Sequence, residues 1–148
     1  MLTALSATLI RGNHPMRYLY TIAASAIVVS STHAVQQQPR SVVAKPLLTQ
    51  ALPDLRGKEV TMLTVEWLPG AVSSPHRHDA DTFVYVLEGS IVMGVAGGPE
   101  VTLGPGGTFY ESPTDVHSVG RNASKTKRAQ FLAILVKNQG APISQPAH

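Results

Sequence analysis

The chain has 148 residues, no cysteine and a formal net charge of +3 at pH 7. That length provides one domain with a hydrophobic core and is too short for two ordinary domains, and without cysteine there are neither disulfides nor thiolate metal ligands. The basic residues are scattered, and outside residues 1–34 the chain holds ten basic and nine acidic side chains, a net charge of +1, which argues against nucleic acid as a partner.

The first segment, residues 1–34, has the pattern of a secretory signal peptide. A basic start at Met16-Arg17 precedes an uncharged, largely apolar run at residues 18–30 and a Thr-His-Ala ending at residues 32–34. The run is shorter than the ~20 residues that a membrane-spanning helix needs. We therefore expect a helical signal peptide, with Met16 as an alternative start, and an exported protein, periplasmic or secreted, that keeps no membrane anchor after cleavage.

The segment after the leader is predicted to lead into a β domain. Residues 35–57 form a polar N-terminal extension with one short edge strand within residues 42–51, which Pro46 interrupts because proline cannot donate to a strand ladder. Residues 58–68 form a long strand that alternates between two faces. The apolar residues on one face of this strand are Leu63, Val65 and Trp67.

Six further strands follow, separated by turns rich in glycine and proline. They are expected at residues 82–88, 90–96, 100–103, 108–111, 116–121 and 129–137. The last is apolar on both faces, which is typical of a central strand covered on both sides. Residues 138–148 are predicted to be a mobile tail. Since no segment after residue 40 has helical periodicity, the pattern indicates an all-β sandwich or barrel.

The stretch from Gly70 to Gly89 holds the strongest chemical signal. His76 and His78 lie two residues apart, just before the predicted strand at residues 82–88. Alternate residues of an extended chain project to the same face, so both imidazoles can point at one atom. A third histidine, His117, lies in a later predicted strand, and a β-barrel would aim all three at its interior.

These residues resemble the two sequence motifs of the cupin family. The first motif, Gly-x5-His-x-His-x3-Glu-x6-Gly, is matched at Gly70, His76, His78 and Gly89. The second motif, a Gly-rich turn, a Pro-containing turn and a His before an Asn, is matched at Gly107, Pro113, His117 and Asn122. The resemblance covers residues 58–137 and implies a jelly-roll β-barrel, also called a double-stranded β-helix.

The resemblance also implies a metal site, with one departure from the family pattern. The position of the usual glutamate ligand is Thr82, so His76, His78 and His117 are the expected ligands. Imidazole suits Fe, Mn, Ni, Cu and Zn, and three such ligands leave positions open for water, oxygen or substrate. Iron is the expected metal among these. The alternative is a pair of exposed loop histidines and one hydrogen-bonded core histidine.

Glu111 is the candidate catalytic residue. It lies six residues before His117 in an otherwise apolar and aromatic strand. An inward side chain could be a fourth ligand, a partner that fixes a histidine tautomer, or a general base with a raised pKa. An outward-facing carboxylate is the alternative, because the sequence does not fix strand parity. Asp79 and Asp81 are weaker candidates, since acidic residues are ordinary in turns.

Two functions are compatible with these residues. The resemblance to three-His cupin dioxygenases implies an oxygenase-type enzyme for a small organic molecule. The alternative, favoured by Thr82, is a non-catalytic cupin module that binds or senses a small molecule. A metal-free sugar epimerase is disfavoured, because that chemistry needs an acid–base pair and not three clustered histidines. Cupin barrels often pair through their sheets, so a homodimer with its edge at residues 58–68 or 42–51 is a further expectation.

Overall fold

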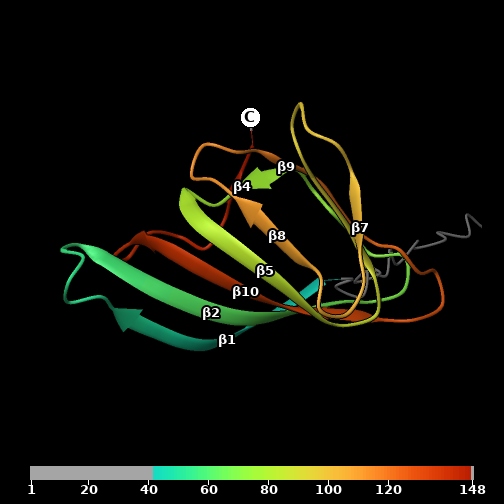
Figure 1. Cartoon of the computed structure of the whole chain (residues 1–148), viewed down its shortest axis with the longest axis horizontal. Coiled ribbons are helices and arrows are strands. Elements are labelled where there is room, and N and C mark those ends of the chain that lie inside the picture. The colour runs from blue at the N-terminus through green and yellow to red at the C-terminus, as the bar shows by residue number, and fades with distance from the viewer. Residues whose placement is uncertain (1–41, 148) are drawn as a thin grey trace, which may run out of the picture. The chain divides into compact units, whose positions relative to one another are not determined.

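The computed structural model describes residues 42–147 as an all-β domain of antiparallel strands (Figure 1). The predicted all-β class is therefore confirmed. Within this range no helix is long and apolar enough to cross a membrane. The signal peptide predicted at residues 1–34 lies outside the described residues, so cleavage and export stay predictions.

Five strands form the first sheet, in an order that brings distant parts of the chain together. In that order they are β1 (Val42–Ala51), β2 (Lys58–Trp67), β10 (Ala129–Asn138), β5 (Ala80–Glu88) and β8 (Thr108–Glu111). Figure 1 shows these strands side by side in one layer. The predicted inward face of β2 is buried, and across the sheet the ring of Trp67 packs edge-on against Phe131 at 5.1 Å.

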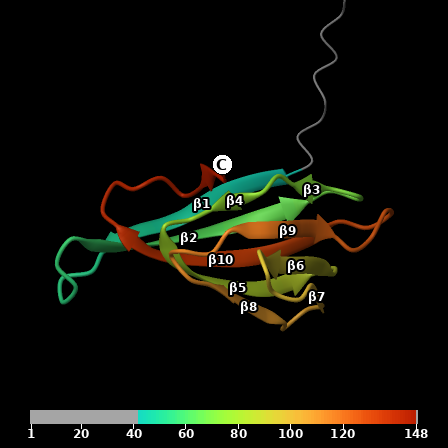
Figure 2. The same ribbon diagram turned by 90° about the horizontal axis from the view of Figure 1, so that it is seen from above.

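The second sheet has six short strands and carries His76 and His117, two of the three histidines among the described residues. In order they are β11 (Gln145–Pro146), β4 (His76–Arg77), β9 (His117–Asn122), β6 (Ile91–Val95) and β7 (Val101–Leu103), with β3 (Val72–Ser73) also paired to β9. Figure 2 shows this layer, seen from above, over the strands of the first sheet. The core lies between the two sheets.

The edge strand β1 differs from its prediction. It runs without interruption for ten residues and passes through Pro46, where the pairing with β2 shifts register between Pro46 and Leu48. An edge strand needs hydrogen bonds on one side only, so a bulge at the proline absorbs the missing N–H. Proline therefore bends this strand and does not end it.

The central strand β10 is covered on one face only by the described part of the chain. Its residues alternate between buried and half-buried along its length, and the outer face of the neighbouring strands exposes Phe83, Tyr85 and Tyr110 by nearly half. The prediction that both faces of β10 are covered is wrong for this chain taken alone. An apolar outer face is compatible with the predicted homodimer, which stays a prediction.

Gly89, the last residue of the first motif, closes the turn after β5. Its φ is +72°, and a Cβ at this position would lie 2.4 Å from the carbonyl oxygen of Arg128. Any side chain would therefore clash with the backbone at the start of β10, besides adopting a conformation that favours glycine. The motif requires glycine here so that the turn can pack against β10.

Candidate metal centre

Three short elements bring the histidines together. His76 in β4 is paired directly with His117 in β9, and their ring centroids are 4.9 Å apart. His78 follows β4, with its ring perpendicular to that of His76 at 4.8 Å. Asp79 has a positive φ of 48°, a conformation in which Asp is enriched, and turns the chain from the histidines into β5.

The three imidazoles offer one ligand atom each, and these atoms all lie within 4.8 Å of one another. The other nitrogen of each ring donates its hydrogen to a backbone carbonyl. The pairs are His76 Nδ1 to Ser74 O at 2.8 Å, His78 Nδ1 to Ile143 O at 2.6 Å, and His117 Nε2 to Val119 O at 2.7 Å. A neutral imidazole with one N–H so engaged keeps one lone pair, and every ring here therefore has a nitrogen free for a metal.

Burial keeps two of these rings neutral near pH 7. Burial, and secondarily the nearby His76, lowers the pKa of His117 to about 4. Burial also lowers the pKa of His78, while its bond to Ile143 opposes the change. Because a metal binds the neutral imidazole, low pKa values keep protons from competing with the metal.

Glu111 points inward, toward the histidines. It is 2% exposed, and its two carboxylate oxygens each lie 3.6 Å from a ring nitrogen, Oε1 from His117 Nδ1 and Oε2 from His78 Nε2. Burial, and secondarily the charge of Asp115, raises the pKa of Glu111 to about 7. The orientation that the sequence left undecided is therefore inward, and the carboxylate can exchange a proton near neutral pH.

Thr82 lies directly across from Glu111 in the pairing of β5 with β8. Directly paired residues on one face of a sheet bring their side chains within about 5 Å of each other, and Thr82 and Glu111 are both almost fully buried. The chain thus has threonine at the usual glutamate position and a glutamate at the paired position of the next strand. The first motif alone cannot reveal this placement, because the two residues are far apart in sequence.

Asp79 and Asp81 are engaged in other contacts. Asp79 pairs with Arg77 at 3.5 Å and accepts a hydrogen bond from Gln145, while Asp81 accepts one from the Tyr110 hydroxyl at 2.6 Å. Neither belongs to the group of clustered ligand atoms. Both act as ordinary surface acids.

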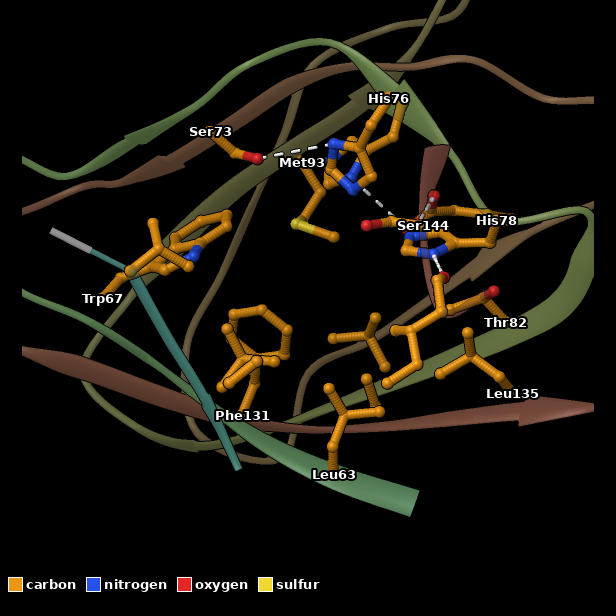
Figure 3. Close-up of a pocket in the computed structure, with 18 residues that line it drawn as sticks. Leu63, Trp67, Ser73, His76, His78, Thr82, Met93, Phe131, Leu135 and Ser144 are labelled. Atoms are coloured by element: carbon orange, nitrogen blue, oxygen red, sulfur yellow. Dashed lines mark hydrogen bonds and ion pairs between the residues drawn. The ribbon is translucent and has the colours of Figure 1, made fainter. Parts of the chain in front are cut away.

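The sequence did not predict a contribution from the C-terminal segment. Residues predicted as a tail form β11, which pairs with β4, and the Ile143 carbonyl holds the His78 ring. Ile143 and Ser144 also line a cavity of about 280 Å³ between the sheets, next to the histidines (Figure 3). Contacts made by a backbone carbonyl leave no residue pattern, so no sequence signal could have found them.

The residues fit a divalent transition metal. Three buried polar atoms have no hydrogen-bond partner in the described part of the chain, namely Thr82 Oγ1, Glu111 Oε2 and His117 Nδ1, and all three residues line the cavity beside the other histidines. Such atoms are rare in folded proteins and each costs about 1–3 kcal/mol. A cation would use the lone pairs of His117 and Glu111, and a set of nitrogen and oxygen donors suits Fe, Mn, Ni, Cu or Zn.

Substitution of Thr82 by valine is expected to leave stoichiometric metal binding in place. Valine has nearly the same shape and removes a buried hydroxyl that lacks a partner, so the free energy of unfolding of the metal-free protein should rise by about 1–3 kcal/mol. Metal content by plasma mass spectrometry and thermal unfolding test this. Loss of the metal in Thr82→Val would show that the threonine oxygen is itself a required ligand.

The part of the chain that carries the three histidines is similar to known proteins. Residues 63–135 match the family model Cupin_2, a cupin domain. The structure is similar to the Cupin_2 domain of an XRE family transcriptional regulator from Enterobacter cloacae, with 25% identity and a TM-score of 0.51 over 64% of this chain and 95% of that chain. No curated protein matches the chain.

Two enzymes are also among the similar structures. Oxalate oxidase, solved with the substrate analogue glycolate, has 21% identity and a TM-score of 0.55 over 72% of this chain and 55% of that chain. The DMSP lyase DddQ from Ruegeria pomeroyi DSS-3 has 16% identity and a TM-score of 0.59, with 72% and 52% covered. The chain spans about half the length of each, and at these identities the likeness concerns the fold alone.

Proposed function

Because this chain belongs to the cupin family through its domain at residues 63–135, we propose that it is a metal-dependent enzyme of oxygenase type that acts on a small molecule. The family assigned from the two sequence motifs is confirmed by that match. The site holds three histidines that could bind a metal ion, and cupins commonly bind metals and small molecules. The proposal goes beyond the family in its reaction type and in the roles of the residues.

One observation carries the proposal. Each of the three imidazoles gives its N–H to a backbone carbonyl, and the remaining ligand atoms converge within 4.8 Å beside a buried carboxylate. Structural histidines in a core need no such convergence, because a hydrogen bond to any nearby group satisfies them. We propose His76, His78 and His117 as the ligands, with iron as the preferred metal and Mn, Ni, Cu or Zn as alternatives.

Each residue then has a defined task. The three carbonyls fix the tautomers and orientations of the rings, and the apolar cavity walls keep water away from the bound molecule. Glu111 is the acid–base residue, since its buried carboxylate lies 3.6 Å from ring nitrogens of His78 and His117 and therefore next to the place where a small molecule would bind. A bound redox metal would supply the electron-transfer chemistry. In a dioxygenase both atoms of O₂ end in the product, so no separate reductant is consumed.

A non-catalytic binding or sensing module is the second candidate. Thr82 in place of the usual glutamate favours it, and one similar structure is the cupin domain of a transcriptional regulator. A module of this kind, with or without a metal, would bind a small molecule without turnover. Since one fold hosts many functions, the likeness to the regulator does not decide between the two.

The full chain, purified without a His tag or added metal, is expected to contain about one equivalent of a transition metal. Plasma mass spectrometry measures the metal, and an oxygen electrode then measures O₂ consumption with a panel of small organic molecules. Consumption of O₂ that needs both the metal and one panel compound would support the enzyme. Tight binding of a compound without any turnover would support the module, and a protein that refuses all added metals would refute the enzyme and favour the module.

A further inference from the structure

The cavity beside the metal centre is polar at one end only. Ser73, Thr82 and Ser144 join the histidines and Glu111 at that end. Figure 3 shows Leu63, Trp67 and Phe131 gathered on the other side of the space, away from His76 and His78. A molecule that fills the cavity therefore meets polar atoms with one end and hydrocarbon with the other.

No lysine or arginine is among the described residues that line this cavity. Lys137 lies near it in sequence, two residues after Leu135 in β10, but its ammonium group is bound to Glu59 and to the Ala141 carbonyl at 2.7 Å. A second anionic group held inside the cavity would lie among apolar side chains with no cation to pair with, which is strongly unfavourable. Hydroxyl groups along the body of a ligand would lack partners for the same reason.

The volume of the cavity limits the size of its ligand. It measures about 280 Å³, and an apolar protein cavity of roughly 150 Å³ is enough to hold benzene. The available space therefore suits a molecule of about ten non-hydrogen atoms. A larger ligand would extend beyond this space, past the exposed rim at Ala44 in β1.

We propose that the ligand is a small amphiphilic molecule, with a single oxygen-bearing head at the histidine end and an apolar body against Leu63, Trp67 and Phe131. Dianionic acids, phosphorylated compounds and polyhydroxylated sugars are excluded by the lining. The position of the head group rests on the proposed function, because the metal would bind it. The apolar body follows from the cavity itself and is independent of the metal.

Three probes of related size test the chemistry of the cavity. Octanoate has one carboxylate and an alkyl body, suberate adds a second carboxylate at the far end, and gluconate carries hydroxyls along its body. With full-length protein loaded with Zn²⁺, isothermal titration calorimetry should show octanoate binding at least about tenfold more tightly than either other probe. The same series is repeated on metal-free protein.

Substitutions in the cavity lining test where the alkyl body of octanoate binds. Ala133→Leu fills the apolar end of the cavity, and Ala44→Leu narrows its exposed rim without entering the core. Both should weaken octanoate by about tenfold or more and leave the metal content and the binding of acetate unchanged. Gln130→Leu, on the outward face of β10, is the matched control and should bind octanoate as the wild type does. Ala44→Leu keeps the test valid if Ala133→Leu does not fold.

The outcomes separate this inference from the proposed function. Suberate or gluconate binding as tightly as octanoate, or no binding of octanoate to metal-loaded protein, would overturn the amphiphilic ligand and leave the metal site standing. Protein that takes up no metal would refute the proposed function. In that case the metal-free series still decides whether the cavity prefers an apolar body.

Discussion

Replacement of His117 by alanine is expected to abolish stoichiometric metal binding. His117 is 4% exposed, and its Nδ1 has no hydrogen-bond partner within the described residues, so this nitrogen is fully available to a cation. Losing a group that only orients a ligand costs 10–100-fold in metal affinity. Losing the ligand itself should cost more than about a hundredfold, measured by competition with a chelating dye.

The variants at His117 need a check on folding, because the residue is buried. His117→Gln keeps a polar side chain of similar reach but is a poor transition-metal ligand, and it should lose the metal as His117→Ala does. Ser118→Ala, the next residue of β9 and only half-buried, should retain about one equivalent. If both His117 variants keep their metal with a normal thermal transition, the ion is bound elsewhere.

Much of the fold was predictable because single residues carry strong local signals. The alternation of Leu63, Val65 and Trp67 gave the buried face of β2. Gly89 is fixed by a positive φ and by the nearby Arg128 carbonyl, so its place in a motif has a direct physical cause. The limits of β1 were harder to predict, because only the pairing of an edge strand decides whether a proline ends it or bends it.

The candidate site also has features that local sequence predicts and features that depend on strand pairing. The spacing of His76 and His78 indicates a shared target for two alternate residues of one extended segment, which is a local property. The inward direction of Glu111 depends on the register of β8 against β5, and the sequence does not contain that register. The backbone carbonyl of Ile143 fixes the tautomer of His78. Any residue at position 143 has such a carbonyl, so this role cannot be predicted from the sequence.

Glu111→Gln is expected to have opposite effects on the metal-free and the metal-loaded protein. The folded-state pKa of Glu111, about 7, lies above its ordinary value of 4.5, so folding favours the protonated form. The stability that this preference contributes is present below pH 4.5 and is lost as the pH rises through 7. At pH 8 the wild type must bury a charge, and the metal-free variant should be more stable by up to about 3 kcal/mol.

With a metal bound, the wild type should instead be more stable than Glu111→Gln. The anionic carboxylate, 3.6 Å from ring nitrogens of His78 and His117, stabilises a divalent cation, and glutamine cannot. Below pH 7 the wild type must release a proton to bind the metal, so its affinity should fall more steeply with decreasing pH than that of Glu111→Gln. Thermal unfolding at pH 8 with and without Zn²⁺, and metal titrations between pH 6 and 8, measure both effects. A variant that is less stable in both states would show that Glu111 is only structural.

An exchange of Thr82 and Glu111 tests whether Glu111 in β8 takes the place of the glutamate that cupins usually have at the position of Thr82 in β5. Thr82→Glu alone would place two buried carboxylates opposite each other in β5 and β8, and it should destabilise the metal-free protein at pH 8 through like-charge repulsion. The double variant Thr82→Glu with Glu111→Thr has the same composition as the wild type and returns the glutamate to the usual cupin position. It should regain most of the metal affinity that Glu111→Thr loses. If the double variant binds metal no better than Glu111→Thr, the two positions do not face the same ion, and Glu111 acts from a place that position 82 cannot reach.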